Sequence, residues 1–249
     1  MSRTEIHPPA SADQQPPPAA MRVKHAWTTR LWHWLTVLSL AILFMSGLNI
    51  FNAHPMLYWG SYGANYDQPW LVLERFPHWA TIPGYYSLAD ARLWHFFFAS
   101  LLAFTLLAFM IASLINRHVQ RDLHIRKSEW AAQNIKRDLA RHARFEFVGE
   151  TPRKGYNWLQ KISYILTIFI LIPGMIFTGI AMSPAMDANW TWLLDVFGGR
   201  QSARSLHFIF AWSLFAFFLV HVALVLLTRP LMQLRGMISG GRKPVEERA

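Results

Sequence analysis

Histidines recur at the start of long apolar stretches in this chain. The sequence contains RLWHW at 30–34, RLWHF at 92–96 and RSLHF at 204–208, each with an Arg three residues before the His. A further His lies fourteen residues after the third of these. Neutral imidazole is a common metal ligand, and an ionisable residue at membrane depth is costly and usually functional. The candidate metal ligands are therefore His33, His95, His207 and His221.

The stretches that hold these histidines are long enough to cross a membrane. The chain has 249 residues, of which 53% are hydrophobic and 15% are charged. A helix of about twenty apolar residues spans a bilayer core of about 30 Å. Four windows without Asp or Glu reach that length, at 31–51, 93–115, 158–182 and 205–227. We therefore predict an all-α integral membrane four-helix bundle.

Basic residues are distributed unevenly around these windows. Twenty of the 24 Lys and Arg lie before the first window, from 117 to 161, or after the fourth window. The positive-inside rule places those segments in the cytoplasm, and this placement of charge argues against nucleic acid as a partner. We expect a multi-pass protein of the inner (plasma) membrane with both termini in the cytoplasm. Its expected parts are a disordered tail at 1–21, a four-span domain at 22–229 and a basic tail at 230–249.

Depth in the membrane pairs the four histidines. His33 begins a window that enters from the cytoplasm, whereas His95 and His207 begin windows that enter from outside. His221 follows His207 by fourteen residues, which is nearly four helical turns and about 21 Å along a helix. We therefore expect His33 to face His221 at the inner level, and His95 to face His207 at the outer level.

Two facing imidazoles at one depth are the ligands that a six-coordinate haem b needs. We therefore predict two b haems stacked across the bilayer, one for each pair. Gly47 lies fourteen residues after His33, on the same helix face at the outer level, where a missing side chain would let a haem approach. A lone His could instead hydrogen-bond a neighbouring helix, so the prediction depends on the matched pairs.

The Arg residues before three of the histidines have two interpretations. Arg30, Arg92 and Arg204 are suited to anchoring a helix at the membrane edge, with the charged end reaching toward water. They are equally suited to pairing with the propionates of a haem. Both roles are compatible, and the sequence does not choose between them.

Other redox centres and other uses of membrane histidines fit less well. The chain has no Cys, which excludes iron–sulfur clusters, covalently attached haem and disulfides within it. A zinc or copper transporter would need ligands at one depth with carboxylates, and a proton pump would also need acidic residues in its spans. The four windows contain no such residues.

The histidine motifs resemble those of the dihaem cytochrome b membrane subunits of nickel–iron hydrogenases and formate dehydrogenases. The long aromatic connection at 52–91 resembles that of thiosulfate reductase-type molybdoenzymes, although an interfacial aromatic belt would have the same composition. The resemblance covers 22–229 and depends mostly on RLWHW, RLWHF and HFIFAWSLFAFFLVH. It implies the same His pairing and electron transfer with the quinone pool. It also implies a periplasmic catalytic partner of molybdopterin or nickel–iron type, or that partner's electron-transfer subunit.

A further motif lies where the cytoplasmic connection meets the third window. The stretch GYNWLQK at 155–161 resembles the Tyr-Asn-x-x-Gln-Lys stretch of the formate dehydrogenase type, which helps to form a menaquinone pocket. The resemblance implies contacts with menaquinone or ubiquinone for Asn157 and Gln160. Asn157 could equally cap the helix that follows.

Two functions of other classes stay open at the level of sequence. One is a stand-alone haem oxidoreductase, such as a superoxide:quinone oxidase that reacts at the outer haem. The other is a structural anchor without haem.

Overall fold

Four long helices form the core of the protein in the computed structural model, which describes residues 21–23, 26–63, 68–115, 124–125, 127–144, 158–228 and 230–244. They are α1 (Trp27–Phe51), α2 (Leu88–Ile115), the segment Trp158–Met182 and α9 (Arg200–Leu227), and all are long and apolar enough to cross a membrane. Each ends at the residue predicted from the sequence, whereas α1, α2 and α9 begin before the predicted starts at 31, 93 and 205. The all-α, multi-pass membrane fold is therefore confirmed.

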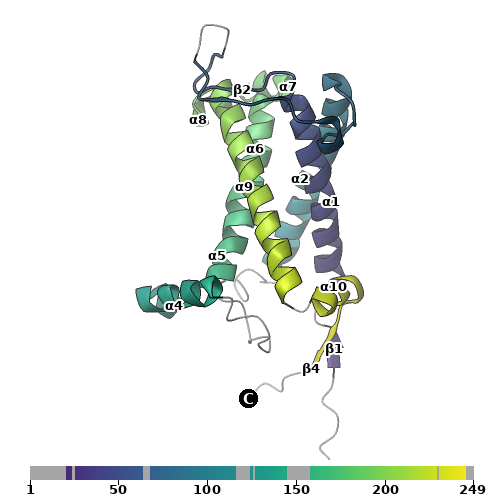
Figure 1. Cartoon of the computed structure of the whole chain (residues 1–249), viewed down its shortest axis with the longest axis vertical. Coiled ribbons are helices and arrows are strands. Elements are labelled where there is room, and N and C mark those ends of the chain that lie inside the picture. The colour runs from purple at the N-terminus through teal and green to yellow at the C-terminus, as the bar shows by residue number, and fades with distance from the viewer. Residues whose placement is uncertain are drawn as a thin grey trace, which may run out of the picture.

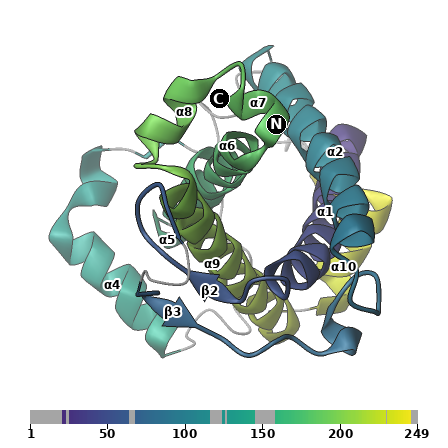
Figure 2. The same ribbon diagram turned by 90° about the horizontal axis from the view of Figure 1, so that it is seen from above.

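The spans pack in two pairs, α1 with α2 and α6 (Ile172–Met182) with α9 (Figure 1). Seen from above, the two pairs face each other around the centre of the bundle (Figure 2). One apolar cluster joins all four spans. Its buried members are Leu43, Phe98, Leu102, Leu106, Leu171, Ile172 and Leu214.

The third span is continuous but changes its winding near the middle. It consists of α5 (Trp158–Leu166), a π-helical turn η3 (Thr167–Leu171) and α6. Pro173 has no N–H with which to bond the carbonyl four residues earlier. Just before it, the N–H of Ile172 bonds the carbonyl of Thr167, five residues earlier. The wider turn lets the span continue through the proline.

The long connection between α1 and α2 lies over one end of the bundle, called the outer end after the predicted topology. It contains β2 (Met56–Leu57), β3 (Leu71–Val72) and the 3-10 turn η1 (His78–Ala80), and β2 pairs with β3 in antiparallel fashion. Two amides near the end of α1 fasten it. Asn49 donates to the carbonyl of Tyr85 at 2.8 Å, and Asn52 exchanges two hydrogen bonds with the backbone of Phe76.

A second connection at the outer end leads into α9 through α7 (Pro184–Asp187) and α8 (Thr191–Val196). Gly198 and Gly199 lie between the end of α8 and the start of α9. Gly199 has a φ of +103°, and a Cβ there would lie 2.7 Å from the backbone of Gly60. Glycine is therefore needed for its backbone angle and for the close approach of the α1–α2 connection.

The inner end carries short elements outside the bundle. They are η2 (Lys127–Trp130), α4 (Ala132–Ala143), α10 (Pro230–Ser239) and the antiparallel strand pair β1 (Met21–Val23) and β4 (Arg242–Pro244). In Figure 1, α4 lies across the direction of the spans. The predicted tail at 1–21 lies outside the described residues except for Met21. The predicted basic tail at 230–249 begins with a helix and a paired strand.

Candidate functional site: two histidine pairs

The structure brings the four span histidines together in two pairs. The ring centroids of His33 and His221 are 6.5 Å apart, and those of His95 and His207 are 6.2 Å apart. An imidazole nitrogen lies about 2 Å from a metal that it binds, so two rings on one ion have centroids on the order of 6 Å apart. The spacing in each pair therefore suits one shared metal ion. The predicted proximity is confirmed, and ligation of haem stays a prediction.

Both imidazoles of the outer pair contact a hydroxyl on a neighbouring helix. The Nδ1 atom of His95 lies 3.0 Å from the Oγ of Ser46 on α1. The Nδ1 atom of His207 lies 2.9 Å from the Oγ1 of Thr178 on α6. A hydroxyl at Nδ1 leaves Nε2 as the ring nitrogen that can bind a metal. Neither hydroxyl was predicted from the sequence, because a Ser or Thr inside a span has no pattern that reveals its partner.

Glycines lie beside the same two rings. A Cβ at Gly47 would lie 3.5 Å from the Cε1 of His95, and a Cβ at Gly179 would lie 3.4 Å from the Cε1 of His207. Gly47 thus lies at the outer level, as expected, next to the imidazole. Its contact with a haem stays a prediction, and Gly179 was not singled out from the sequence.

An aromatic side chain contacts each ring of the inner pair. The ring of His221 stacks on Phe217 with centroids 5.8 Å apart, and the ring of His33 meets Trp34 edge-on at 5.1 Å. Farther along the same helices, Phe44 of α1 stacks on Phe215 of α9 at 4.6 Å. These contacts supply an apolar setting, in which electrostatic interactions are stronger than in water.

Arg204 contacts the outer connection. Its guanidinium donates to the carbonyl of Met56 at 2.9 Å and also to the carbonyl of His54. It lies over the ring of Phe51, with Cζ 5.6 Å from the centroid. Burial, together with the charge of Arg204, lowers the pKa of His54 below its ordinary value. These contacts favour the anchoring role, and pairing with a haem propionate stays a prediction.

The other two predicted arginines lie at opposite ends of the bundle. Arg30 donates to the carbonyl of Ile238 on α10 at 2.6 Å, which ties the start of α1 to the segment after the last span. Arg92 lies at the start of α2 with Cζ 5.9 Å from the ring centroid of Phe96. Arg30 therefore anchors α1, and a propionate partner stays a prediction for both residues.

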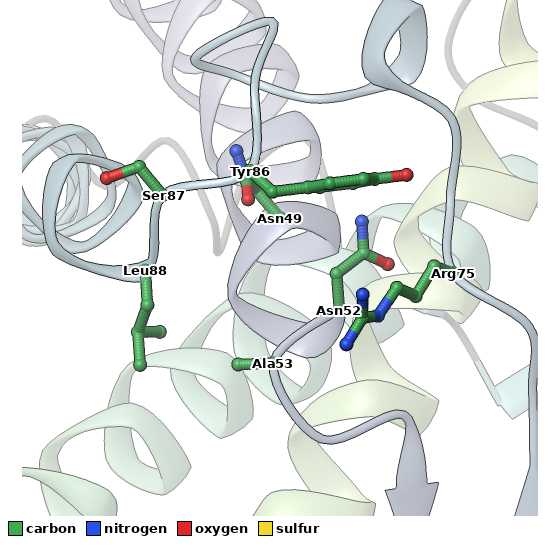
Figure 3. A pocket seen from close by; sticks show the side chains of 7 residues that line it. All are labelled: Asn49, Asn52, Ala53, Arg75, Tyr86, Ser87 and Leu88. Carbon is green, nitrogen blue, oxygen red and sulfur yellow. The ribbon is translucent and has the colours of Figure 1, made fainter.

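A small hollow lies where the outer connection meets α1 and α2 (Figure 3). Its volume is about 140 Å³. It is lined by Asn49, Asn52, Ala53, Arg75, Tyr86, Ser87 and Leu88. Pockets that enclose small ligands usually measure about 300–1,000 Å³, so this hollow is too small for a haem or a quinone.

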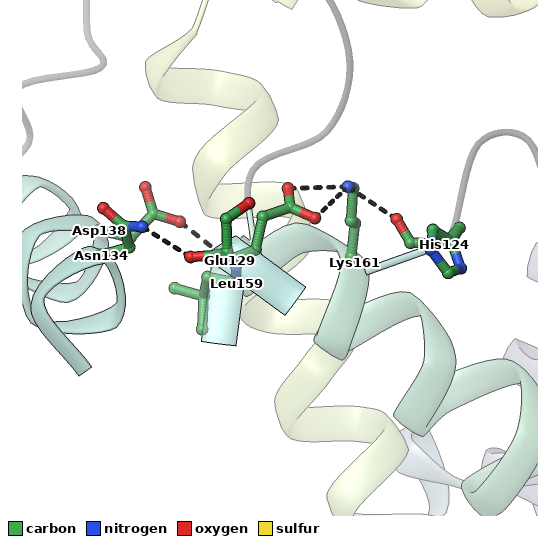
Figure 4. Close-up of polar contacts among 7 residues, drawn as sticks. His124, Glu129, Asn134, Asp138, Leu159 and Lys161 are labelled. Carbon is green, nitrogen blue, oxygen red and sulfur yellow. Dashed lines mark hydrogen bonds and ion pairs between the residues drawn. The ribbon is translucent and has the colours of Figure 1, made fainter. Parts of the chain in front are cut away.

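A polar cluster joins the inner end of the third span to the segment before it (Figure 4). The ammonium of Lys161 lies 2.8 Å and 2.9 Å from the two carboxylate oxygens of Glu129 and donates to the carbonyl of His124 at 3.0 Å. The N–H of Leu159 donates to a carboxylate oxygen of Asp138 at 3.4 Å. The side chain of Lys161 is therefore occupied by protein partners.

The predicted quinone residues belong to the same end of the third span. Asn157 lies outside the described residues. Gln160 lies in the first turn of α5, where its side chain is exposed. Lys161, the next residue of the motif, turns toward Glu129. Quinone contacts of Asn157 and Gln160 stay predictions.

Several known proteins are similar in sequence to this chain. The family model of prokaryotic cytochrome b561 matches residues 24–240. A relative from Azospira oryzae, which carries the name of a protein-methionine-sulfoxide reductase subunit YedZ1, is 28% identical over 80% of this chain and 87% of its own. Two further relatives are named as Ni/Fe-hydrogenase B-type cytochrome subunits. The one from Azotobacter vinelandii is 26% identical over 78% of this chain and 76% of its own. The one from Cupriavidus necator is 25% identical over 78% of this chain and 74% of its own. The chain belongs to the prokaryotic cytochrome b561 family.

Proposed function

We propose that this membrane b-type cytochrome carries electrons between a periplasmic oxidoreductase and the quinone pool through two bis-histidine haems. The observation that carries the proposal is the presence of two His pairs at two levels of the bundle. Membership of the family supports b-type haem and electron transfer. The names of the relatives, which are a protein-methionine-sulfoxide reductase subunit and Ni/Fe-hydrogenase cytochrome subunits, support an oxidoreductase partner.

Each pair would hold one haem. His33 and His221 would bind the inner haem, and His95 and His207 the outer haem. When bound, the haems supply one-electron redox chemistry. His221 lies fourteen residues after His207, which corresponds to about 21 Å along α9, so the two binding levels lie in opposite halves of the membrane.

The protein's own contribution is to hold the imidazoles and to keep water away. Ser46 and Thr178 contact the outer rings, and Trp34 and Phe217 each contact one ring of the inner pair. Arg30, Arg92 and Arg204 lie near the ends of their spans, where one guanidinium can hold a backbone segment and also reach a propionate.

We place the oxidoreductase partner at the outer end, which the distribution of basic residues assigns to the periplasm. Exposed aromatic side chains lie along both outer connections. They include Trp59, Tyr62, Trp79, Trp190 and Trp192. Aromatic residues are enriched in protein interfaces and in the headgroup layer, so the same surface serves a partner and a membrane boundary.

We place quinone at the inner end, near His221. Asn157 and Gln160 at the start of the third span would donate hydrogen bonds to a quinone carbonyl through neutral amides. An amide supplies a donor without placing a fixed charge in the membrane. This part of the proposal is supported by the resemblance of GYNWLQK to the formate dehydrogenase stretch.

The haem content of the purified full-length protein tests the proposal. We expect a pyridine haemochrome assay to give two haems b per chain. A count of zero or one would contradict the two-haem arrangement, and a colourless protein would leave only a structural role.

Purification from native membranes tests the partner. Recovery of a molybdenum or nickel subunit with the cytochrome would support the proposal. A protein that is isolated alone, and that reduces quinone with superoxide, would instead identify a stand-alone oxidase.

A further inference from the structure

We propose that Ser46 and Thr178 are positioning residues for the outer haem. Each hydroxyl accepts a hydrogen bond from the Nδ1–H of one outer histidine and thereby fixes Nε2 as the iron-binding nitrogen. The inference rests on the proposed function, because it requires a haem between His95 and His207.

The hydroxyl of Ser46 has one proton, and its contacts favour backbone carbonyls as the acceptors of that proton. A hydroxyl donates one hydrogen bond and accepts through its lone pairs. The Oγ of Ser46 lies 2.7 Å from the carbonyl oxygen of Ile42 and 3.2 Å from that of Leu43, and a carbonyl can only accept. Toward His95 the oxygen is therefore the acceptor, at 3.0 Å from Nδ1. The proton of the neutral imidazole lies on Nδ1, which leaves the lone pair on Nε2.

Thr178 repeats this arrangement on another helix. Its Oγ1 donates to the carbonyl of Gly174 at 2.6 Å and lies 2.9 Å from the Nδ1 of His207. By the same argument as for Ser46, the oxygen is the acceptor toward that nitrogen. Ser46 belongs to α1 and holds a histidine of α2, whereas Thr178 belongs to α6 and holds a histidine of α9. Each packed pair of spans therefore contains one hydroxyl that bonds the outer histidine of the neighbouring helix.

Glycine follows the hydroxyl residue in both copies. The dipeptides are Ser46-Gly47 and Thr178-Gly179, and a Cβ at either glycine would lie at 3.4–3.5 Å from the Cε1 of the imidazole. The hydroxyl holds one atom of the ring while the glycine leaves space beside the next. Each dipeptide thus holds the outer histidine of the neighbouring helix in position.

A hydrogen bond from Nδ1–H makes the imidazole a stronger electron donor to the metal. Stronger donation stabilises ferric iron over ferrous iron and so lowers the reduction potential. Both hydroxyls contact the outer pair, so they should lower the potential of the outer haem and leave that of the inner haem unchanged. Loss of a hydrogen-bond partner of a metal-binding imidazole also weakens metal binding, typically by about 10–100-fold.

The test compares Ser46→Ala and Thr178→Val in the full-length protein, once the wild type has been shown to hold two haems. Spectroscopic redox titration should show a more positive potential for the outer haem and an unchanged inner potential. The outer haem should also dissociate more readily, by roughly tenfold in affinity. Thr178→Ser keeps the hydroxyl and should restore wild-type values.

Two matched controls come from the same spans. Thr105 and Ser213 make the same bond to the carbonyl four residues earlier, at 2.6 Å and 2.8 Å, and face no histidine in the described structure. Thr105→Val and Ser213→Ala should therefore leave both potentials unchanged.

The results distinguish failure of the proposed function from failure of this inference. A wild type without a haem at the outer pair would contradict the proposed function itself. Unchanged outer potentials in haem-loaded Ser46→Ala and Thr178→Val would overturn the inference alone. Equal shifts of both haems would also overturn it, since they would indicate a general disturbance. If Thr178→Val loses the outer haem, restoration by Thr178→Ser supports the inference, and no restoration contradicts it.

Discussion

His207 and His221 lie fourteen residues apart on α9, and each faces a histidine from a different helix. Fourteen residues make nearly four turns, so both side chains project from the same side of α9. The helix α2 supplies the partner at the outer level, and α1 supplies the partner at the inner level. One helix therefore takes part in both pairs, and a change at either of its histidines should affect only one of them.

The first prediction concerns this pairing. His33→Ala and His221→Ala should each lower the haem content from two to one and remove the same spectral component, because each removes one ligand of the inner haem. His95→Ala and His207→Ala should each remove the other component. Redox titration followed by absorbance identifies which component is lost.

A histidine outside the spans provides the control for the pairing experiment. His78 lies in η1 at the outer end, and its replacement by Ala should leave both components in place. If His33→Ala and His95→Ala removed the same component, the assignment by depth would be wrong.

The second prediction concerns the contact between α6 and α9. A Cβ at Gly174 would lie only 2.7 Å from the ring of Phe210, so Gly174→Ala forces the ring or a helix to move. Overpacking of this kind costs about 1–3 kcal/mol in the free energy of unfolding. Thermal unfolding in detergent should show a lower midpoint for this variant. Phe210→Leu combined with Gly174→Ala should recover part of the loss.

Gly47→Ala is the matched control for Gly174→Ala. Its Cβ would lie 3.5 Å from the Cε1 of His95, which is an ordinary van der Waals contact. The polypeptide around Gly47 should therefore tolerate the methyl group, whether or not a haem does. Loss of outer haem without loss of helical structure would then show that a haem lies against Gly47. If Gly47→Ala kept both haems, a midpoint as low as that of Gly174→Ala would mean that the cost at Gly174 does not come from Phe210.

The histidine pairs could be predicted from the sequence because they depend on few quantities. The rise of a helix and the side from which each span enters fix the depth of every residue along it. Depth alone then matches His33 with His221 and His95 with His207. The lengths of the spans follow in the same way from the thickness of the bilayer.

Lateral contacts could not be predicted in this way. Ser46 and Thr178 reach a histidine because of how α1 rotates against α2 and α6 against α9, which no local pattern encodes. Arg204 was expected at the membrane edge, but its bonds to the carbonyls of His54 and Met56 depend on the path of a distant connection. The pairing of β1 with β4 likewise joins two segments from opposite ends of the chain.

The third prediction concerns pH at the outer end. Burial and the nearby charge of Arg204 lower the pKa of His54, so the folded protein binds this proton less readily than the unfolded chain. The free energy of unfolding should therefore fall as the pH drops through about 6.5, the ordinary pKa of histidine. His54→Gln removes the titrating imidazole and keeps the backbone carbonyl that Arg204 contacts.

Thermal unfolding at several pH values between 5.5 and 7.5 checks the role of His54. The wild type should lose more stability on acidification than His54→Gln. The difference should be small, because the side chain is exposed and solvent screens its charge. Identical pH dependence in the two proteins would show that His54 titrates as it does in the unfolded chain.

The last prediction concerns the quinone end. The resemblance of GYNWLQK to the formate dehydrogenase stretch implies that the neutral amides of Asn157 and Gln160 donate to a quinone carbonyl. Asn157→Leu should leave both haems bound and spectrally normal. It should slow oxidation of the inner haem by a quinone analogue by up to about tenfold, because a hydrogen bond contributes about 0.5–1.5 kcal/mol. Gln160→Leu should act in the same direction.

Stopped-flow oxidation of the reduced, fully haem-loaded protein measures this effect. Gln133→Leu, which replaces an exposed amide on α4, is the matched control and should react at the wild-type rate. Unchanged kinetics in Asn157→Leu and Gln160→Leu would mean that Asn157 only caps the third span. Quinone would then have to react elsewhere, and the outer pair beside the α1–α2 connection would be the next place to examine, since it is the other level at which an electron can leave the bundle.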